Sequence, residues 1–227
     1  AENTSGNHIY VKDLNKSGSP LVQISDDYFK EINYVVNEGP RFLFSTNIDA
    51  PNYRVIAVDL ASPAKENWSV VIPETKNVLL TGSGGGKLFA EYLIDAKSAV
   101  KQFDLKGNLE RDIELPGIGS VSGFGARRDE KDLYYSFTSF TNPSTIYHYD
   151  IASGKSTLYI QPKVDFNPDD YETKQIFYTS KDGTKVPMFI VHKKGLKMDG
   201  TNPTMLYAYG GFNVSLTPSF SSFRVAW

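Results

Sequence analysis

The chain alternates short apolar runs with polar turns, and four of the runs share one pattern at nearly constant spacing. Each is a β-rich segment that ends in aspartate followed by an aliphatic residue. The four segments are Ile9–Leu14, Val55–Leu60, Val100–Leu105 and Ile146–Ile151. Their aspartates, Asp13, Asp59, Asp104 and Asp150, are 46, 45 and 46 residues apart. A repeat of roughly 40–50 residues built from short strands is typical of a β-propeller.

Further apolar runs flank these segments, so the repeating unit consists of four strands, which make one propeller blade. Aspartate often ends a strand because its carboxylate bonds the turn backbone, but four matches in register indicate a true repeat. The flanking runs are Ile32–Val36, Arg41–Thr46 and Trp68–Ile72 around the second segment; Val78–Thr81, Leu88–Leu93 and Arg111–Leu115 around the third; Val121–Phe124, Leu133–Thr138 and Ser156–Ile160 around the fourth; and Pro20–Ile24 after the first. Turn-forming residues separate the runs, among them Gly82–Gly86.

The count of strands predicts a mostly β chain with about three and a half blades. The chain opens in the third strand of one blade and then completes three more. Propellers close with about four to eight blades, and the sequence does not start with methionine. We therefore expect a fragment, or the ordered part, of a longer polypeptide. Such a fragment would expose strand edges, so we expect it to be poorly stable or to self-associate.

The pattern changes after Ile160. A polar connector at residues 164–170 is followed by predicted strands at Thr173–Thr179 and Thr184–His192, joined by a tight turn at Lys181–Gly183. Thr204–Tyr209 is continuously apolar or aromatic apart from its first residue, which predicts a third strand buried on both faces, as in an α/β sheet. This run stops at Gly210-Gly211-Phe212.

A buried strand that breaks into Gly-Gly has one known chemical use. In α/β-hydrolases the loop after the third strand supplies a donor to the oxyanion hole, and glycine allows close approach of backbone to substrate. The residues by themselves favour an ordinary Gly-Gly turn, with an oxyanion site as the alternative.

Other candidate chemistry is weak. Ser83 comes nearest to a Gly-x-Ser-x-Gly nucleophile elbow, but Thr81 stands in place of the first glycine. Gly82–Gly86 lacks the Lys-Ser/Thr of a phosphate loop and reads as a blade turn. The histidines, His8, His148 and His192, are expected to be structural or solvated, and no cluster has metal-ligand spacing.

Composition narrows the classes of partner. The chain has 227 residues, 40% of them hydrophobic, and a net charge of −2, which gives no electrostatic footprint for nucleic acid or an anionic membrane. No apolar run approaches the ~18 residues that span a bilayer. The absence of cysteine excludes a disulfide framework and a thiolate nucleophile in this stretch. It leaves cytoplasm and periplasm both open.

Tyr171–Ser219 closely resembles the prolyl oligopeptidase family of serine peptidases, through SKDGTKVPMFIVHKKG followed by YGGF. The stretches NYVVNEG, APNYRVIAVDL and YYSFTSFTNPSTIYHYDI extend the resemblance to residues 33–39, 50–60 and 134–151. The resemblance implies a seven-bladed β-propeller joined to an α/β-hydrolase domain. Residues 1–169 would then be part of the propeller, and residues 170–227 the first strands of the hydrolase domain.

By the same resemblance, the full-length enzyme would cleave short peptides after proline, with the propeller excluding large folded proteins. Tyr209 matches the tyrosine whose hydroxyl donates to the oxyanion, and Phe212 matches an aromatic residue that lines the proline pocket. The nucleophilic serine, the acid and the histidine are expected beyond Trp227, so this chain alone is predicted to be inactive. The implied partners are short proline-containing peptides and the remainder of the parent polypeptide, with no cofactor and a monomeric parent.

Two other functions remain open. One is a propeller binding module without chemistry, in which the last residues merely cap the blades. The other is a related oligopeptidase of different specificity, such as one that prefers basic or N-terminal substrates.

Overall fold

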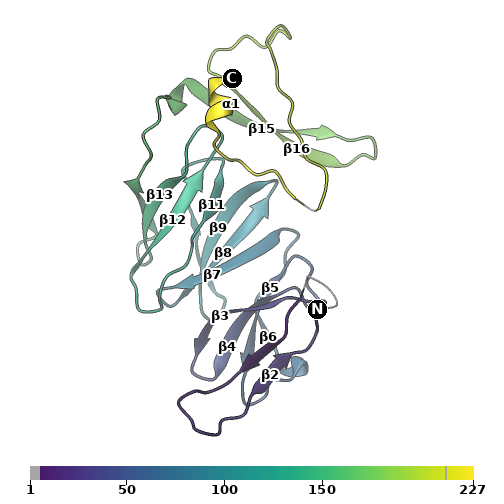
Figure 1. Ribbon diagram of the computed structural model, residues 1–227, viewed down its shortest axis with the longest axis vertical. Helices are drawn as coiled ribbons and strands as arrows, with labels where there is room; N and C mark the ends of the chain where they lie inside the picture. The colour runs from purple at the N-terminus through teal and green to yellow at the C-terminus, as the bar shows by residue number, and fades with distance from the viewer. Residues whose placement is uncertain (1–5, 213) are drawn as a thin grey trace. The chain divides into compact units, whose positions relative to one another are not determined.

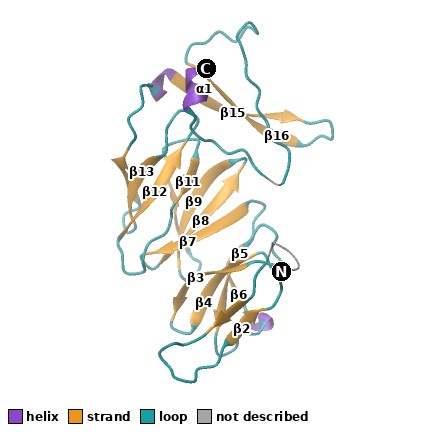
Figure 2. Cartoon of the chain, viewed as in Figure 1, coloured by secondary structure: helices purple, strands orange, loops and turns teal. Residues whose placement is uncertain are grey.

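The computed structural model describes residues 6–212 and 214–227, and nearly all of its regular structure is β-strand (Figures 1 and 2). Three four-stranded antiparallel sheets follow one another along the chain. The first contains β3 (Ile32–Glu38), β4 (Arg41–Thr46), β5 (Arg54–Asp59) and β6 (Ser69–Ile72); the second β7 (Val78–Gly84), β8 (Lys87–Ile94), β9 (Lys97–Asp104) and β10 (Leu109–Ile113); the third β11 (Ser120–Ser122), β12 (Asp132–Thr138), β13 (Thr145–Asp150) and β14 (Lys155–Ile160). Neighbours in each sheet are neighbours in sequence, so the predicted four-stranded unit is confirmed.

Two smaller antiparallel sheets lie outside this series. The strands β1 (Ile9–Val11) and β2 (Val22–Ser25) form one, and β15 (Tyr171–Thr179) and β16 (Lys185–Lys193) form the other, as predicted. The helical elements among the described residues are short: η1 (Lys65–Asn67), η2 (Pro168–Asp170) and α1 (Ser222–Ala226).

The chain divides into two compact units that do not coincide with contiguous stretches of sequence. One unit contains the residues up to Leu93 together with Val100–Ile113 and Phe124–Asp132. The other contains Ile94–Ala99, Glu114–Gly123 and Leu133–Trp227. The first unit therefore holds the first sheet and most of the second, and the other unit holds most of the third sheet with the C-terminal region.

The four repeat aspartates act as turn caps. In each copy the carboxylate accepts a backbone N–H two or three residues further on. The bonds run from Asn15 to Asp13 (2.9 Å), Ala61 to Asp59 (2.9 Å), Lys106 to Asp104 (2.9 Å) and Ser153 to Asp150 (2.6 Å). The aspartate repeat in the sequence therefore corresponds to the same kind of local hydrogen bond at four turns.

The middle strands of the sheets carry the core. In the first sheet, four consecutive residues of β4 and four of β5 are buried, because side chains on both faces of these strands are covered. Ile32, Phe44, Ile56 and Val58 pack into one cluster, which Ile24 of β2 joins. Burying each such side chain contributes roughly 1.5–3 kcal/mol. A continuous apolar run is therefore the expected pattern for the middle of this sheet.

The glycine run Gly82–Gly86 is not simply a turn, so that prediction is wrong in part. Gly82 and Gly84 belong to β7, and only Gly85 and Gly86, with φ of 56° and 70°, form the two-residue turn to β8. Residues Phe124–Arg127, here called the strap, run beside β7. The Ala126 N–H donates to Ser83 O (2.9 Å), and the Gly85 N–H donates to Arg127 O (3.0 Å). Gly82 and Gly84 leave room for this close approach, because a Cβ on either would clash with the strap.

A polar network of Lys87, Gln102 and Glu110 links three strands of the second sheet. The Gln102 side chain, 1% exposed, donates from Nε2 to Glu110 Oε2 (2.8 Å), and Lys87 forms an ion pair with the same carboxylate. Burial alone would raise the pKa of Glu110, but the hydrogen bonds from Lys87 and Gln102 and the charge of Lys87 together lower it.

Because its pKa is lowered on folding, ionised Glu110 stabilises the fold above the ordinary glutamate pKa of about 4.3. This contribution is lost as the pH falls through the folded-state value. We expect Glu110→Gln to destabilise the protein at pH 7, and the difference from wild type to shrink below about pH 4. Urea unfolding at several pH values measures this. Glu114→Gln, which removes an exposed carboxylate, is the control, and an equal pH response of both variants would contradict the assignment.

The predicted third strand at Thr204–Tyr209 is not present. All six residues are exposed, with Leu206 83% and Tyr207 69% exposed, and no described strand pairs with them. An apolar run becomes a buried strand only if neighbouring strands and covering side chains accept it. The described residues provide neither, because β15 and β16 pair only with each other.

Candidate functional site

The two site residues predicted from the sequence are Tyr209, the last residue of this exposed segment, and Phe212, three residues further on. The loop that carries them is here called the Tyr209 loop. The Tyr209 side chain is 50% exposed, and its hydroxyl bonds to none of the residues that the structure describes. Phe212 is 94% exposed and has a φ of 52°, a conformation uncommon outside glycine. The Val214 N–H donates to Gly211 O (3.1 Å). Both side chains are thus presented to solvent, three residues apart in the sequence.

The histidines make packing contacts. His192 on β16 lies opposite Glu172 of β15, with 3.2 Å between Nε2 and Oε1, a separation of ion-pair length. The His148 ring packs on Tyr134, with ring centroids 5.3 Å apart. The His8 ring stacks on Tyr28 at 3.5 Å. These contacts give each histidine a role in the fold.

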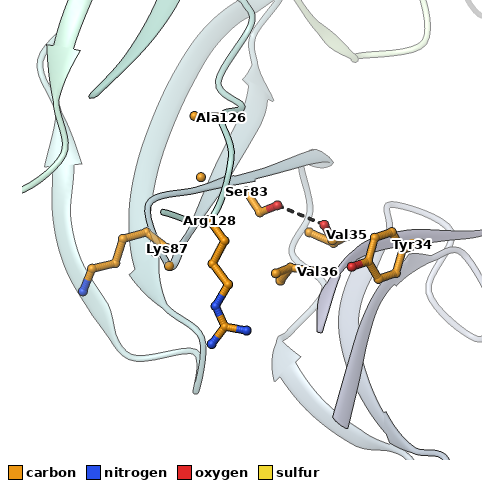
Figure 3. A pocket seen from close by; sticks show the side chains of 9 residues that line it. Tyr34, Val35, Val36, Ser83, Lys87, Ala126 and Arg128 are labelled. Carbon is orange, nitrogen blue, oxygen red and sulfur yellow. Dashed lines mark hydrogen bonds between the residues drawn. The ribbon is translucent and has the colours of Figure 1, made fainter. Parts of the chain in front are cut away.

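A cavity of about 200 Å³ lies in the first compact unit, between the middle of β3, the β7–β8 turn and the strap with the following Arg128 (Figure 3). Its lining includes Tyr34, Val35, Val36, Ser83, Lys87, Ala126 and Arg128. Ser83, the nearest match to a nucleophile elbow, donates from Oγ to Val35 O (2.9 Å).

The cations of this cavity are already paired. Arg128 donates from Nη1 to Asn37 O (2.7 Å) and lies 3.2 Å from Glu38 Oε1 through Nη2. Lys87 is paired with Glu110. The polar groups of the cavity therefore hold the sheets together, and they leave no activated nucleophile or uncompensated charge among these side chains.

Residues 6–212 and 214–227 contain no group of three or more His, Cys, Asp or Glu side chains that could hold a metal ion. Nor do they contain a helix long and apolar enough to cross a bilayer. The Tyr209 loop is the candidate site that remains.

Comparison with known protein families gives a match over most of the chain. The sequence profile of "Prolyl oligopeptidase, N-terminal beta-propeller domain" matches residues 1–162. The prolyl endopeptidase of Elizabethkingia meningoseptica is 48% identical over all 227 residues, which cover 32% of its length.

Solved structures give the same result in three dimensions. A structure from the study "Structural and Mechanistic Analysis of Two Prolyl Endopeptidases: Role of Inter-Domain Dynamics in Catalysis and Specificity" matches with a TM-score of 0.85 and 42% identity, over 98% of this chain and 33% of that one. Prolyl oligopeptidase B from Galerina marginata matches with a TM-score of 0.83 and 30% identity, over 96% of this chain and 32% of that one. The chain therefore spans about a third of the length of these relatives.

Proposed function

Because the chain belongs to the prolyl oligopeptidase family, we propose that it is part of a serine endopeptidase that hydrolyses short peptides on the carboxyl side of proline. The observation that carries this proposal is the match to a prolyl endopeptidase along the whole chain, from the first sheet through the Tyr209 loop. We assign residues 1–169 to a propeller of seven blades, and residues 170–227 to the start of an α/β-hydrolase domain.

Tyr209 is the oxyanion donor in this proposal. The residue is half exposed and its hydroxyl bonds to none of the described residues, so this hydroxyl is available to donate to a substrate. Gly210 and Gly211 follow it and leave room for a peptide backbone to approach. A donor of this kind stabilises the negative charge that develops on the carbonyl oxygen of the scissile bond.

Phe212 and the exposed apolar run support the same assignment. Phe212 is 94% exposed, Leu206 83% and Tyr207 69%, and exposed apolar surface of this kind marks a binding site or an interface. We propose that Phe212 lines the proline pocket, and that strands of the hydrolase domain cover Thr204–Tyr209 in the full-length enzyme. The nucleophilic serine, the acid and the histidine would come from the remainder of that enzyme.

The limit on substrate length is a role that we attribute to the propeller. In the three four-stranded sheets the strands are hydrogen-bonded in sequence order, and a closed ring of such sheets would admit only small or extended chains. We propose that the propeller restricts entry to short peptides, whereas a binding module without chemistry would hold a partner and release it unchanged.

The test uses the full-length enzyme and this 227-residue chain with a chromogenic peptide ending in Gly-Pro. We expect turnover by the full-length enzyme, loss of it after treatment with a serine-directed phosphonate, and no turnover by the chain alone, because an oxyanion donor without a nucleophile does not cleave a peptide. Peptides ending in Gly-Ala and Gly-Arg are the controls. Binding without cleavage would support the binding module, and preference for Gly-Arg would support an oligopeptidase of other specificity.

A further inference from the structure

After the Tyr209 loop the chain returns to the third sheet at Pro218–Phe220. Ser120 Oγ donates to Pro218 O (2.9 Å), and the Phe220 N–H donates to Thr138 Oγ1 (3.3 Å). Pro218 is buried, in contrast to the exposed Thr204–Gly210. Ser120 and Thr138 are cross-strand partners at the edge of the β11–β12 pair. We call these two side chains the hydroxyl clamp.

The polar groups at the clamp have hydrogen-bond partners. The Thr138 hydroxyl donates to Asn142 O (3.1 Å) while it accepts from Phe220, so both functions of this hydroxyl are used. Proline has no N–H, so binding of its carbonyl oxygen leaves no donor unpaired at Pro218. Side chains here satisfy backbone groups that a neighbouring strand would otherwise bond.

The strand that carries Ser120 is itself fixed. The Ser98 N–H donates to Gly119 O (3.0 Å), and the Val121 N–H donates to Ser98 Oγ (3.2 Å). A Cβ on Gly119 would lie 2.3 Å from the Phe137 ring and 2.5 Å from Thr138 O. The backbone next to Ser120 is therefore tightly packed and holds the clamp in place.

The clamped segment is also held from its other end. Arg224 Nη2 donates to Ser219 O and Ser219 Oγ, each at 3.0 Å, and the Arg224 guanidinium lies 5.8 Å from the centre of the Phe140 ring. The Phe220 ring lies 6.3 Å from Phe166 in the connector before β15. Pro218–Phe220 is thus an anchor point for the loop that precedes it.

We propose that the hydroxyl clamp positions the Tyr209 hydroxyl, which makes Ser120 and Thr138 positioning residues that the propeller supplies to the oxyanion site. This inference rests on the role proposed for Tyr209. The loop between Tyr209 and Pro218 begins with Gly210 and Gly211, which add backbone freedom. Fixing its downstream end limits the conformations that the loop can adopt, and a displacement of an ångström at a catalytic group can cost about 10²-fold in rate.

The test is the double variant Ser120→Ala/Thr138→Val in the full-length enzyme, assayed on a slow amide substrate. We expect kcat to fall about tenfold with KM little changed, because the clamp does not touch the substrate. Thr138→Ser keeps a hydroxyl, and Ser122→Ala removes an exposed one bonded to Ser136; both should retain wild-type kcat. Ser120→Ala alone, expected to show part of the loss, serves if the double variant does not fold. Wild-type kcat in the clamp variants would overturn the inference.

Combination with Tyr209→Phe separates positioning from general destabilisation. If the clamp acts through the Tyr209 hydroxyl, the clamp variants should cause no further loss of kcat in a Tyr209→Phe background. Losses that multiply would show that the clamp acts elsewhere and would overturn the inference alone. If Tyr209→Phe by itself retained wild-type kcat, the proposed role of Tyr209 would fail, and the inference with it.

Discussion

Replacing Tyr209 with phenylalanine in the full-length enzyme is expected to lower kcat/KM by about 10- to 10³-fold, which corresponds to about 1.4–4 kcal/mol. The change removes one hydroxyl and almost no volume, and this hydroxyl bonds to none of the described residues, so folding should be spared. The lost hydrogen bond forms fully only when the carbonyl oxygen becomes an oxyanion.

The loss should therefore appear in kcat, with KM little changed where KM reflects binding. A slow amide substrate is the right probe, because a good leaving group makes acylation less limiting. Tyr207→Phe is the matched control, since it removes a hydroxyl from the same segment, two residues away, that has no proposed part in the reaction. If Tyr209→Phe and Tyr207→Phe had the same activity as wild type, Tyr209 would be a packing residue.

Gly82→Ala is expected to destabilise the protein by about 2–3 kcal/mol. A Cβ at this position would lie 1.8 Å from Phe124 O and 3.0 Å from Phe124 C, so the backbone of the strap or of β7 must move. That movement would disturb the hydrogen bonds between the strap and β7, such as Ala126 N–H to Ser83 O (2.9 Å). Denaturant unfolding of the purified protein measures the change in free energy.

Gly125→Ala is the control because it lies in the same strap. A Cβ on Gly125 would meet only Ser83 O, at 3.8 Å, which is an ordinary contact. We expect a change within about 0.5 kcal/mol of wild type. Equal stabilities of the Gly82 and Gly125 variants would show that the strap yields without cost.

The strands were predictable where local pattern determines them. Each repeat aspartate caps its own turn through residues two or three positions away, so the repeat is visible in sequence. The strands β4 and β5, in the middle of the first sheet, are buried on both faces and read as apolar runs. The hairpin β15–β16 was predictable for the same reason, because Lys181–Gly183 encodes its turn locally.

Features that depend on distant residues were not predictable. Gly82–Gly86 was predicted to be a turn because nothing near it in sequence reveals the strap, about 40 residues away. The hydroxyl clamp joins Ser120 to Pro218, 98 residues apart, and Thr138 to Phe220, 82 apart, through residue types that occur on any surface. For Thr204–Tyr209 the prediction was wrong in the opposite sense. Its apolar pattern predicts a buried strand, but no described residues cover it or pair with it.

The site was predictable only as a motif. The sequence of Tyr209-Gly210-Gly211-Phe212 places two candidate side chains on one loop, and the structure does so too. The backbone conformation of Phe212, with a φ of 52°, could not be predicted from the sequence. Phenylalanine does not favour this region of φ.

The strap has a consequence for how such a repeat could be rearranged. It belongs to the first compact unit, although it follows β11 of the other unit in sequence. A duplication or exchange of the second sheet alone, cut at Val78 and Ile113, would leave the edge of β7 with glycines and no strap to cover it. The segment that must be kept together is therefore longer than one sheet, because it extends past β11 of the next sheet to Asp132. Recombination at the ends of the second sheet would produce chains in which the edge of β7 is uncovered.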